Sequence, residues 1–266
     1  MFSLRNKILT LVFVSGFLVT SCASGVLGPS ESEIEAEAAR EFGKMRAELP
    51  LVTDRATIDY VHCVVTAVVD SLESPHSDQN WELAIFDVKQ VNAFAMPGGK
   101  VGVFSGLLDI ATNQDQLATV VGHELAHVTA RHVNERASRG GFTDAGIYVA
   151  AIVLGQGHSG LTHTAYEGLR YGASLGLILP YERKQESEAD VIGLEYMARA
   201  GFDPRESVEL WKKMSEEKGD EKPPEFLSTH PADEKRIDAL VAMYPNTLVL
   251  FNEAKSQGKE PTCGRQ

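Results

Sequence analysis

The sequence predicts an α+β fold that is mainly helical and contains one small β-sheet. Most of the chain shows apolar residues at helical spacing, whereas strand-like alternation is confined to residues 81–106. With 266 residues, 43% hydrophobic and 23% charged, the chain is long enough for one domain with a substantial core. A formal net charge of −12 argues against a nucleic-acid partner, because no basic field is present to displace phosphate counterions.

The N-terminal segment, residues 1–21, has the order of charges and apolar residues of a signal peptide. Arg5 and Lys7 precede an apolar run that ends in "LVTSC". This ending resembles a bacterial lipobox, which predicts that Cys22 carries lipid and anchors the chain to a membrane. Ala23 in place of aspartate, by resemblance to enterobacterial lipoproteins, favours the periplasmic face of the outer membrane. The alternative is an ordinary secretory peptide with Cys22 as an incidental thiol.

The remaining cysteines, Cys63 and Cys263, form an even pair in a compartment that would be oxidising. A disulfide between them would tie the C-terminal tail to the domain. Two unpaired thiols are the alternative, and the separation of their Cα atoms decides between the two.

The first half of the chain predicts two helices and then three strands. Residues 31–48 and 52–72 have helical spacing, and residues 81–86 and 91–97 predict short strands. Residues 98–106 predict a glycine turn followed by a third strand. A helical segment follows at residues 107–111. Asn113 predicts the N-cap of a longer helix, with Gln116 at the capping-box position, which reaches Asn134 and ends before residues 138–141.

The second half predicts helices separated by one apolar segment. Residues 141–180 are rich in glycine and alanine; they suit core helices by default, with a substrate channel or a membrane-resting surface as alternatives. A helix over 181–200 should end at Gly201, and the next should begin at Asp203 and Pro204. Residues 220–226 predict a loop, and a short final helix opens after Pro231.

The stretch "GHELAH" places His123 and His127 four residues apart on one helix. Such positions differ by about 40° and about 6 Å, so both imidazoles can reach one metal ion. Glu124 is turned about 100° from His123. It can act as general base on a water that the ion activates.

A third protein ligand is required, and "ESEAD" supplies the best candidates. One known extension of the motif needs glycine at position 130 and histidine at position 133, but the chain has Ala130 and Val133. Glu186 and Asp190 share a helix face, so one carboxylate can bind metal while the other accepts a hydrogen bond from a ligand imidazole. We expect Asp190 to pair with His123; a solvated acidic helix face is the alternative.

The stretch "STHP" carries a further histidine between a loop and a helix. His230 could stabilise the oxyanion of a tetrahedral intermediate, or it could occupy the open metal position in a resting form. A histidine that merely begins a helix is the third possibility.

Together "GHELAHVTARH", "ESEAD", "THPADEKR" and "NAFAMPGGKVGVFSGLL" resemble the M48 family of zinc metallopeptidases, and especially its short bacterial lipoproteins. The resemblance covers roughly residues 50–245. It implies a zincin-like (gluzincin) fold whose small sheet presents an edge strand to the active site. It also implies one Zn²⁺ per chain on His123, His127 and Glu186, with Glu124 as catalytic base and a regulatory or transition-state role for His230.

On this resemblance the chain divides into a signal peptide (1–21), a tether and helix (22–49), a peptidase domain (50–250) and a tail (251–266). The expected activity is endopeptidase cleavage of polypeptides, in particular misfolded or unassembled envelope proteins, with outer-membrane assembly machinery as a possible partner. The expected substrate-binding edge strand consists of Lys100, Val101, Gly102, Val103 and Phe104. The alternative function is a periplasmic chaperone or assembly factor whose zinc site is plugged or vestigial.

Overall fold

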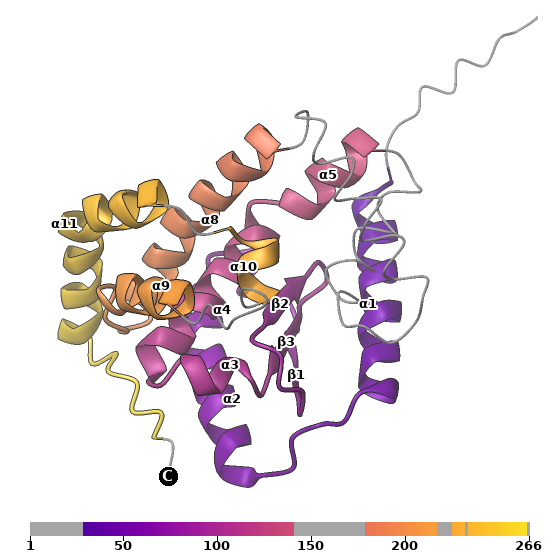
Figure 1. Ribbon diagram of the computed structural model, residues 1–266, viewed down its shortest axis with the longest axis horizontal. Coiled ribbons are helices and arrows are strands. Elements are labelled where there is room, and N and C mark those ends of the chain that lie inside the picture. Colours follow the sequence, from indigo (N-terminus) through magenta and orange to yellow (C-terminus); the bar gives the residue numbers. More distant parts are fainter. Residues whose placement is uncertain (1–28, 141–178, 217–224, 232–233, 265–266) are drawn as a thin grey trace, which may run out of the picture.

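The computed structural model describes residues 29–140, 179–216, 225–231 and 234–264. The predicted signal peptide, the predicted lipidation site Cys22 and nearly all of the apolar segment 141–180 lie outside these residues. Figure 1 shows the arrangement: a small sheet stands between the single helix α1 and a larger group of helices.

The sheet has three strands in the order β1-β3-β2, as predicted in number and position. Strand β1 (Glu82–Phe86) runs parallel to β3 (Lys100–Phe104), and β2 (Ala93–Met96) runs antiparallel to β3. In the turn between β2 and β3, Gly98 and Gly99 have φ angles of 77° and 74°, a conformation that glycine adopts without a Cβ clash.

The two faces of the sheet bury different side chains, because successive residues of a strand point to opposite sides. One face packs phenylalanine rings against helix α1 (Glu31–Glu48), which begins with a capping box at Ser30. The other face packs against the helical group. The rings between α1 and the sheet are Phe42, Phe86, Phe94 and Phe104.

Helix α4 (Gln114–Thr129) lies at the centre of the helical group, next to strand β2 and helices α2 (Arg55–Val69), α8 (Leu179–Arg199) and α9 (Glu206–Glu216). It is buried from Gln116 to Val128. The short α3 (Leu107–Ile110) and α10 (Glu225–Thr229), together with α5 (His132–Gly140) and α11 (Glu234–Ser256), complete the described helices.

Several helix ends follow the sequence predictions. Asn113 caps α4 by accepting a hydrogen bond from the backbone of Gln116. Gly201 ends α8 with a φ of 91°, and the backbone N–H groups of Gly201 and Phe202 bond back to Ala198 and Met197. This pattern is the Schellman motif that the glycine predicts.

Four boundaries differ from the predictions. Helix α4 ends at Thr129, so the predicted single helix to Asn134 is wrong; Arg131 breaks it with a φ of 58°, and α5 then continues to Gly140. Helix α9 begins at Glu206, because residues 203–205 form a turn held by the Asp203 carboxylate. Part of the predicted loop 220–226 belongs to α10, and the final helix runs on through Pro245 to Ser256.

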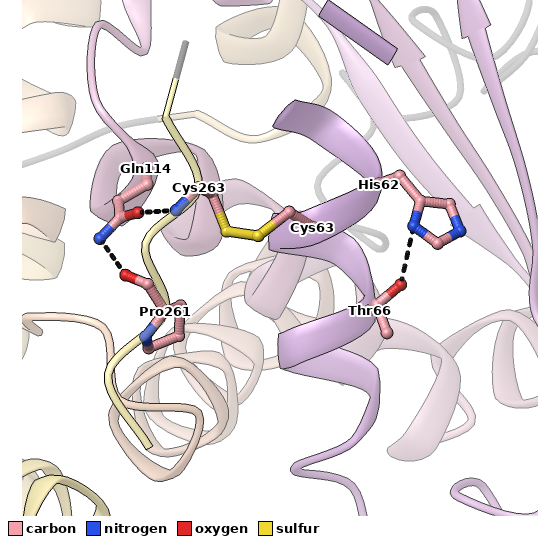
Figure 2. Close-up of a disulfide and its surroundings, with 6 residues drawn as sticks. All are labelled: His62, Cys63, Thr66, Gln114, Pro261 and Cys263. Carbon is pink, nitrogen blue, oxygen red and sulfur yellow. Dashed lines mark hydrogen bonds between the residues drawn. A yellow bond between two sulfur atoms is a disulfide. The ribbon is translucent and has the colours of Figure 1, made fainter. Parts of the chain in front are cut away.

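A disulfide joins Cys63 of α2 to Cys263 in the C-terminal tail, with Cα atoms 5.6 Å apart. Figure 2 shows Gln114 beside it: its side chain donates to the carbonyl of Pro261 and accepts from the backbone N–H of Cys263, each at 2.8 Å. The tail is therefore attached both to α2 and to the first turn of α4.

Within the described residues, none of the helices has the combination of length and apolarity that crossing a membrane requires.

Candidate metal centre

Helices α4 and α8 cross at two glycines, and this contact brings the predicted ligands together. A Cβ atom at Gly122 would lie 2.6 Å from the carbonyl oxygen of Gly193, and one at Gly193 would lie 2.6 Å from the backbone nitrogen of His123. Only glycine at both positions allows the helices to approach so closely. His123 of α4 thereby comes to face Glu186 and Asp190 of α8.

Four side chains from three segments converge at this crossing: His123 and His127 from α4, Glu186 from α8, and His230 beyond α10. One ligand atom from each lies within 4.8 Å of the others. His123 Nε2 lies 3.1 Å from His127 Nε2, 3.3 Å from Glu186 Oε2 and 3.1 Å from His230 Nδ1. His127 Nε2 lies 3.4 Å from Glu186 Oε1, and His230 Nδ1 lies 2.9 Å from Glu186 Oε2.

These spacings fit a metal ion. Ligands at about 2.0–2.1 Å in a tetrahedron lie about 3.3 Å from one another, close to the distances within the cluster. Ring nitrogens and a carboxylate packed this closely in a buried site need protons or a cation between them. Three imidazoles and one carboxylate are also a donor set that suits zinc.

The residues of the cluster differ in the direction in which their surroundings shift the pKa. Burial opposes a charged His123, but its contacts with Asp190 and Glu186 outweigh burial and raise its pKa to about 9. Burial holds the pKa of His127 well below the ordinary value. Burial also opposes the ionised Glu186, yet the neighbouring His230, His127 and His123 keep its pKa well below the usual range. Glu186 is thus an anion directed at the imidazoles.

Glu124 lies at the edge of the cluster. Its Oε1 is 3.2 Å from His230 Nε2, and its Oε2 accepts a hydrogen bond of 3.4 Å from the backbone N–H of Ala95 in β2. The residue is only 4% exposed, and this burial raises the pKa of its carboxyl group. A carboxylate with a raised pKa is better suited to accept and return a proton near neutral pH.

Asp190 and Arg236 lie behind His123. Asp190 Oδ1 is 3.1 Å from His123 Nδ1, and the Arg236 guanidinium donates to both Asp190 oxygens at 2.7 and 2.8 Å. Despite burial, these hydrogen bonds keep the pKa of Asp190 below its ordinary value. Arg236 also donates to the carbonyl of Pro231 and lies over the ring of Trp211 at 4.4 Å. It therefore connects the residue behind His123 to the segment that holds His230.

His230 is held at the cluster from its own side as well. Its backbone N–H donates to the carbonyl of Phe226 at 2.7 Å, and its ring stacks on the Phe226 ring with centroids 4.7 Å apart. The His230 side chain is 14% exposed, which makes it the most accessible of the four candidate ligands.

The prediction that residues 100–104 form an edge strand is wrong. Lys100, Val101, Gly102, Val103 and Phe104 form β3, which is paired with β1 on one side and β2 on the other, so its peptide groups cannot accept another strand. Within the described residues, β2 is the strand at the edge nearest the cluster. The backbone N–H of Ala95 points from that edge towards Glu124.

Three residues lie at the site although the spacing of the sequence motifs did not predict their contacts there. Arg236 and His132 lie in the quoted motifs "THPADEKR" and "GHELAHVTARH", but their contacts depend on how separate helices meet. Ala95 lies in "NAFAMP", and its position next to Glu124 depends on the strand order.

Comparison with known proteins identifies the family of this chain. The model described as "Peptidase family M48" matches residues 56–244. The chain is 34% identical over 220 residues to "Mitochondrial metalloendopeptidase OMA1" of Schizosaccharomyces pombe, covering 82% of this chain and 62% of that protein. It is 32% identical over 199 residues to "Beta-barrel assembly-enhancing protease" of Yersinia pestis, covering 73% of this chain and 40% of that protein.

The protein of the latter name from Escherichia coli strain K12 is 30% identical over 199 residues, with the same coverage of 73% and 40%. The chain therefore spans less than two thirds of the length of these relatives. The family match runs from α2 into α11 and includes every member of the ligand cluster, and we conclude that the chain belongs to peptidase family M48.

Proposed function

We propose that this protein is a zinc-dependent endopeptidase. The observation that carries the proposal is the buried group of His123, His127, Glu186 and His230, whose ligand atoms lie within 4.8 Å of one another, with Glu124 beside it. Membership of a peptidase family and relatives named metalloendopeptidase and protease support the same reaction class.

In this proposal His123, His127 and Glu186 hold the ion, which when bound would polarise the scissile carbonyl and acidify a water molecule. Glu124 takes a proton from the attacking water at its carboxylate and returns it to the leaving amine. Asp190 orients the His123 ring through the 3.1 Å contact of its Oδ1 with Nδ1, and the bidentate contact with Arg236 keeps Asp190 ionised.

The edge of β2 supplies the substrate-binding surface in this proposal, in place of β3. A peptide that adds to this edge would run past Glu124, because the Ala95 N–H at the edge lies 3.4 Å from that carboxylate. Main-chain hydrogen bonds tolerate many side chains. Such tolerance suits misfolded or unassembled polypeptides as substrates, and we place these substrates in the cell envelope on the basis of the lipobox-like N-terminus.

The direct test is cleavage of casein by the purified protein with and without a chelator. We expect cleavage that the chelator abolishes and that added Zn²⁺ restores, because metal removal leaves Glu124 without an activated water. Cleavage that persists in the chelated, metal-free protein would rule the proposal out.

The position of His230 favours a second candidate state, in which the site is closed. His230 Nδ1 lies as close to Glu186 as any other ligand, so it can fill the metal position that water needs. A site closed permanently in this way would leave a periplasmic chaperone or assembly factor rather than a protease.

The His230→Ala variant distinguishes the roles of this histidine. If His230 only blocks the site, the basal rate of casein cleavage should rise. If it stabilises the oxyanion, kcat should fall by about a hundredfold or more with a modest change in KM. We expect the loss of kcat to dominate; unchanged kinetics and unchanged zinc affinity would remove His230 from both roles.

We also propose that lipid on Cys22 anchors the protein to the bacterial envelope, with the outer membrane, facing the periplasm, as its location. The relatives named for β-barrel assembly support contact with outer-membrane assembly machinery. Cys22→Ala should move the protein from the membrane fraction to the soluble fraction. Unchanged sedimentation with membranes would point to another anchor.

A further inference from the structure

A third histidine of the motif, His132, lies directly behind the candidate ligand His127. Its Nδ1 is 2.8 Å from His127 Nδ1, and the two rings meet edge to face with centroids 4.9 Å apart. His132 is only 2% exposed. It contacts the side of the His127 ring that is turned away from the ligand cluster.

We infer that His132 is a positioning residue for the metal: its Nδ1 accepts a hydrogen bond from His127 Nδ1–H and so directs the lone pair of His127 Nε2 at the ion. The inference rests on the proposed metal site. It assigns His132 a function that Asp190 performs for His123 on the other side of the cluster.

The position of the hydrogen on each ring shows which histidine donates the hydrogen bond between the two Nδ1 atoms. His127 Nε2 faces Glu186 at 3.4 Å and His123 at 3.1 Å, so a ligand role requires a lone pair there. A neutral imidazole then carries its hydrogen on Nδ1. His132 Nδ1 is therefore the acceptor, and the His132 hydrogen resides on Nε2, which lies 3.6 Å from the carboxylate of Glu188.

A break in the helix at Arg131 allows the rings of His127 and His132 to meet. In a continuous α-helix, position 132 would lie about 140° around the axis from position 127, and the two rings could not meet. The chain instead leaves the helix at Arg131, a non-glycine residue with a φ of 58°, and starts α5 at His132. Such a conformation is costly for a residue with a side chain and often marks a functional site.

The partners of the two ligand histidines differ in kind. His123 is backed by a buried carboxylate that Arg236 holds on both oxygens. His127 is backed by an imidazole whose Nε2 lies 3.6 Å from the half-exposed Glu188 side chain. Helix α8 supplies alternate residues to these layers: Glu186 to the cluster, Glu188 behind His132, and Asp190 behind His123. A residue that served packing alone would not need a ring nitrogen at this place.

The test compares three substitutions of His132 in the full chain and measures zinc affinity by chelator competition. His132→Leu fills space without an acceptor. His132→Asn places an oxygen near the position of Nδ1, whereas His132→Gln places it near Nε2. His62→Leu, at an exposed position on α2, is the matched control. The absorption spectrum of the Co²⁺-loaded proteins reports ligand geometry independently of activity.

We expect zinc affinity to fall about 10- to 100-fold in His132→Leu, the usual effect of removing such a partner, and to recover largely in His132→Asn but not in His132→Gln. The Co²⁺ spectrum should change in the Leu and Gln variants and stay close to wild type in the Asn and control variants. If the Leu variant does not fold, the comparison of Asn with Gln carries the same test.

Equal zinc affinity and equal Co²⁺ spectra in the Asn and Gln variants would overturn the inference and leave His132 a packing role. A His132→Leu variant that folds and binds zinc as tightly as wild type would also overturn it. If wild type itself binds no zinc, both the proposed function and this inference fail. If wild type binds zinc and the variants give the contrary results above, only this inference fails.

Discussion

In the proposed metal site, Glu186 of α8 adds a carboxylate to the two histidines of α4. Its two carboxylate oxygens contact different imidazoles, and it is buried at the crossing of α4 and α8. Removing it takes away the only carboxylate among the four candidate ligands and leaves imidazoles alone, so zinc binding should weaken.

Glu186→Ala should therefore purify with much less zinc than wild type, which should contain about one ion per chain. Glu195→Ala, on the same helix but in a surface ion pair with Arg199, is the control and should keep its zinc. Elemental analysis of the three proteins makes the comparison. Full, tight zinc occupancy in Glu186→Ala would contradict the ligand assignment.

The ease with which single residues could be predicted depends on how local their geometry is. His123, Glu124 and His127 lie on one helix, so spacing alone gives their relative placement. Asp190 comes to lie behind His123 as the spacing of "ESEAD" predicts. The contacts of Arg236 and His132 could not be predicted in this way, because one needs α11 to pack on α8 and the other needs the break at Arg131.

At the scale of the helices, the glycine contact between α4 and α8 determines how closely the two helices approach at the site. Glycine within a helix normally costs about 0.5–1 kcal/mol relative to alanine. Here the cost is offset, because a Cβ at Gly193 would lie within 2.6 Å of the His123 backbone.

Gly193→Ala should lower the free energy of unfolding by about 1–3 kcal/mol, the usual range for overpacking, and should weaken zinc binding by moving His123 away from Glu186. Gly43→Ala is the matched control: Gly43 lies in helix α1, and a Cβ there meets no atom within 4 Å. It should raise stability by about 0.5–1 kcal/mol. Urea unfolding tests both, and equal effects of the two substitutions would show that the crossing is not tight.

The break at Arg131 allows a second test of an element boundary. Arg131→Gly should keep or raise the free energy of unfolding, since glycine adopts a positive φ without strain. Arg131→Val should lower it by about 1–2 kcal/mol and weaken zinc binding, because a side chain branched at Cβ resists this conformation. If the valine variant is as stable as the glycine variant, the break does not strain the chain.

The positions of helices and strands could be predicted from the sequence where they depend on a local pattern. The order of the strands in the sheet could not. The positions of all three strands and the capped start of α4 follow from spacing and from single capping residues. Which strand lies at the edge depends on the parallel pairing of β1 with β3, which no local pattern encodes. The proposed substrate surface is consequently the edge of β2 and not β3.

For the whole molecule, the Cys63–Cys263 disulfide closes a loop with a sequence separation of 200 residues. In the chain-entropy view, a bridge over so long a loop restricts the unfolded state by an amount worth up to about 5 kcal/mol. It also keeps the tail against Gln114, at the start of the helix that carries the site.

The double variant Cys63→Ser, Cys263→Ser should unfold at a lower temperature than wild type, with about 2–5 kcal/mol less stability. A reductant should produce the same change in wild type and none in the double variant. Calorimetry with and without reductant provides the measurement; a reductant-insensitive wild type would show that this bond does not stabilise the fold.

We propose that Glu124 is the base of a metal-dependent peptidase whose site is formed by α4, α8 and the His230 segment. The most direct measurement is casein cleavage by Glu124→Gln with its zinc content determined on the same sample. We expect a folded protein with wild-type zinc content and with cleavage reduced by at least about a hundredfold, because the amide cannot accept the proton of water. Undiminished cleavage by the zinc-loaded variant would contradict it.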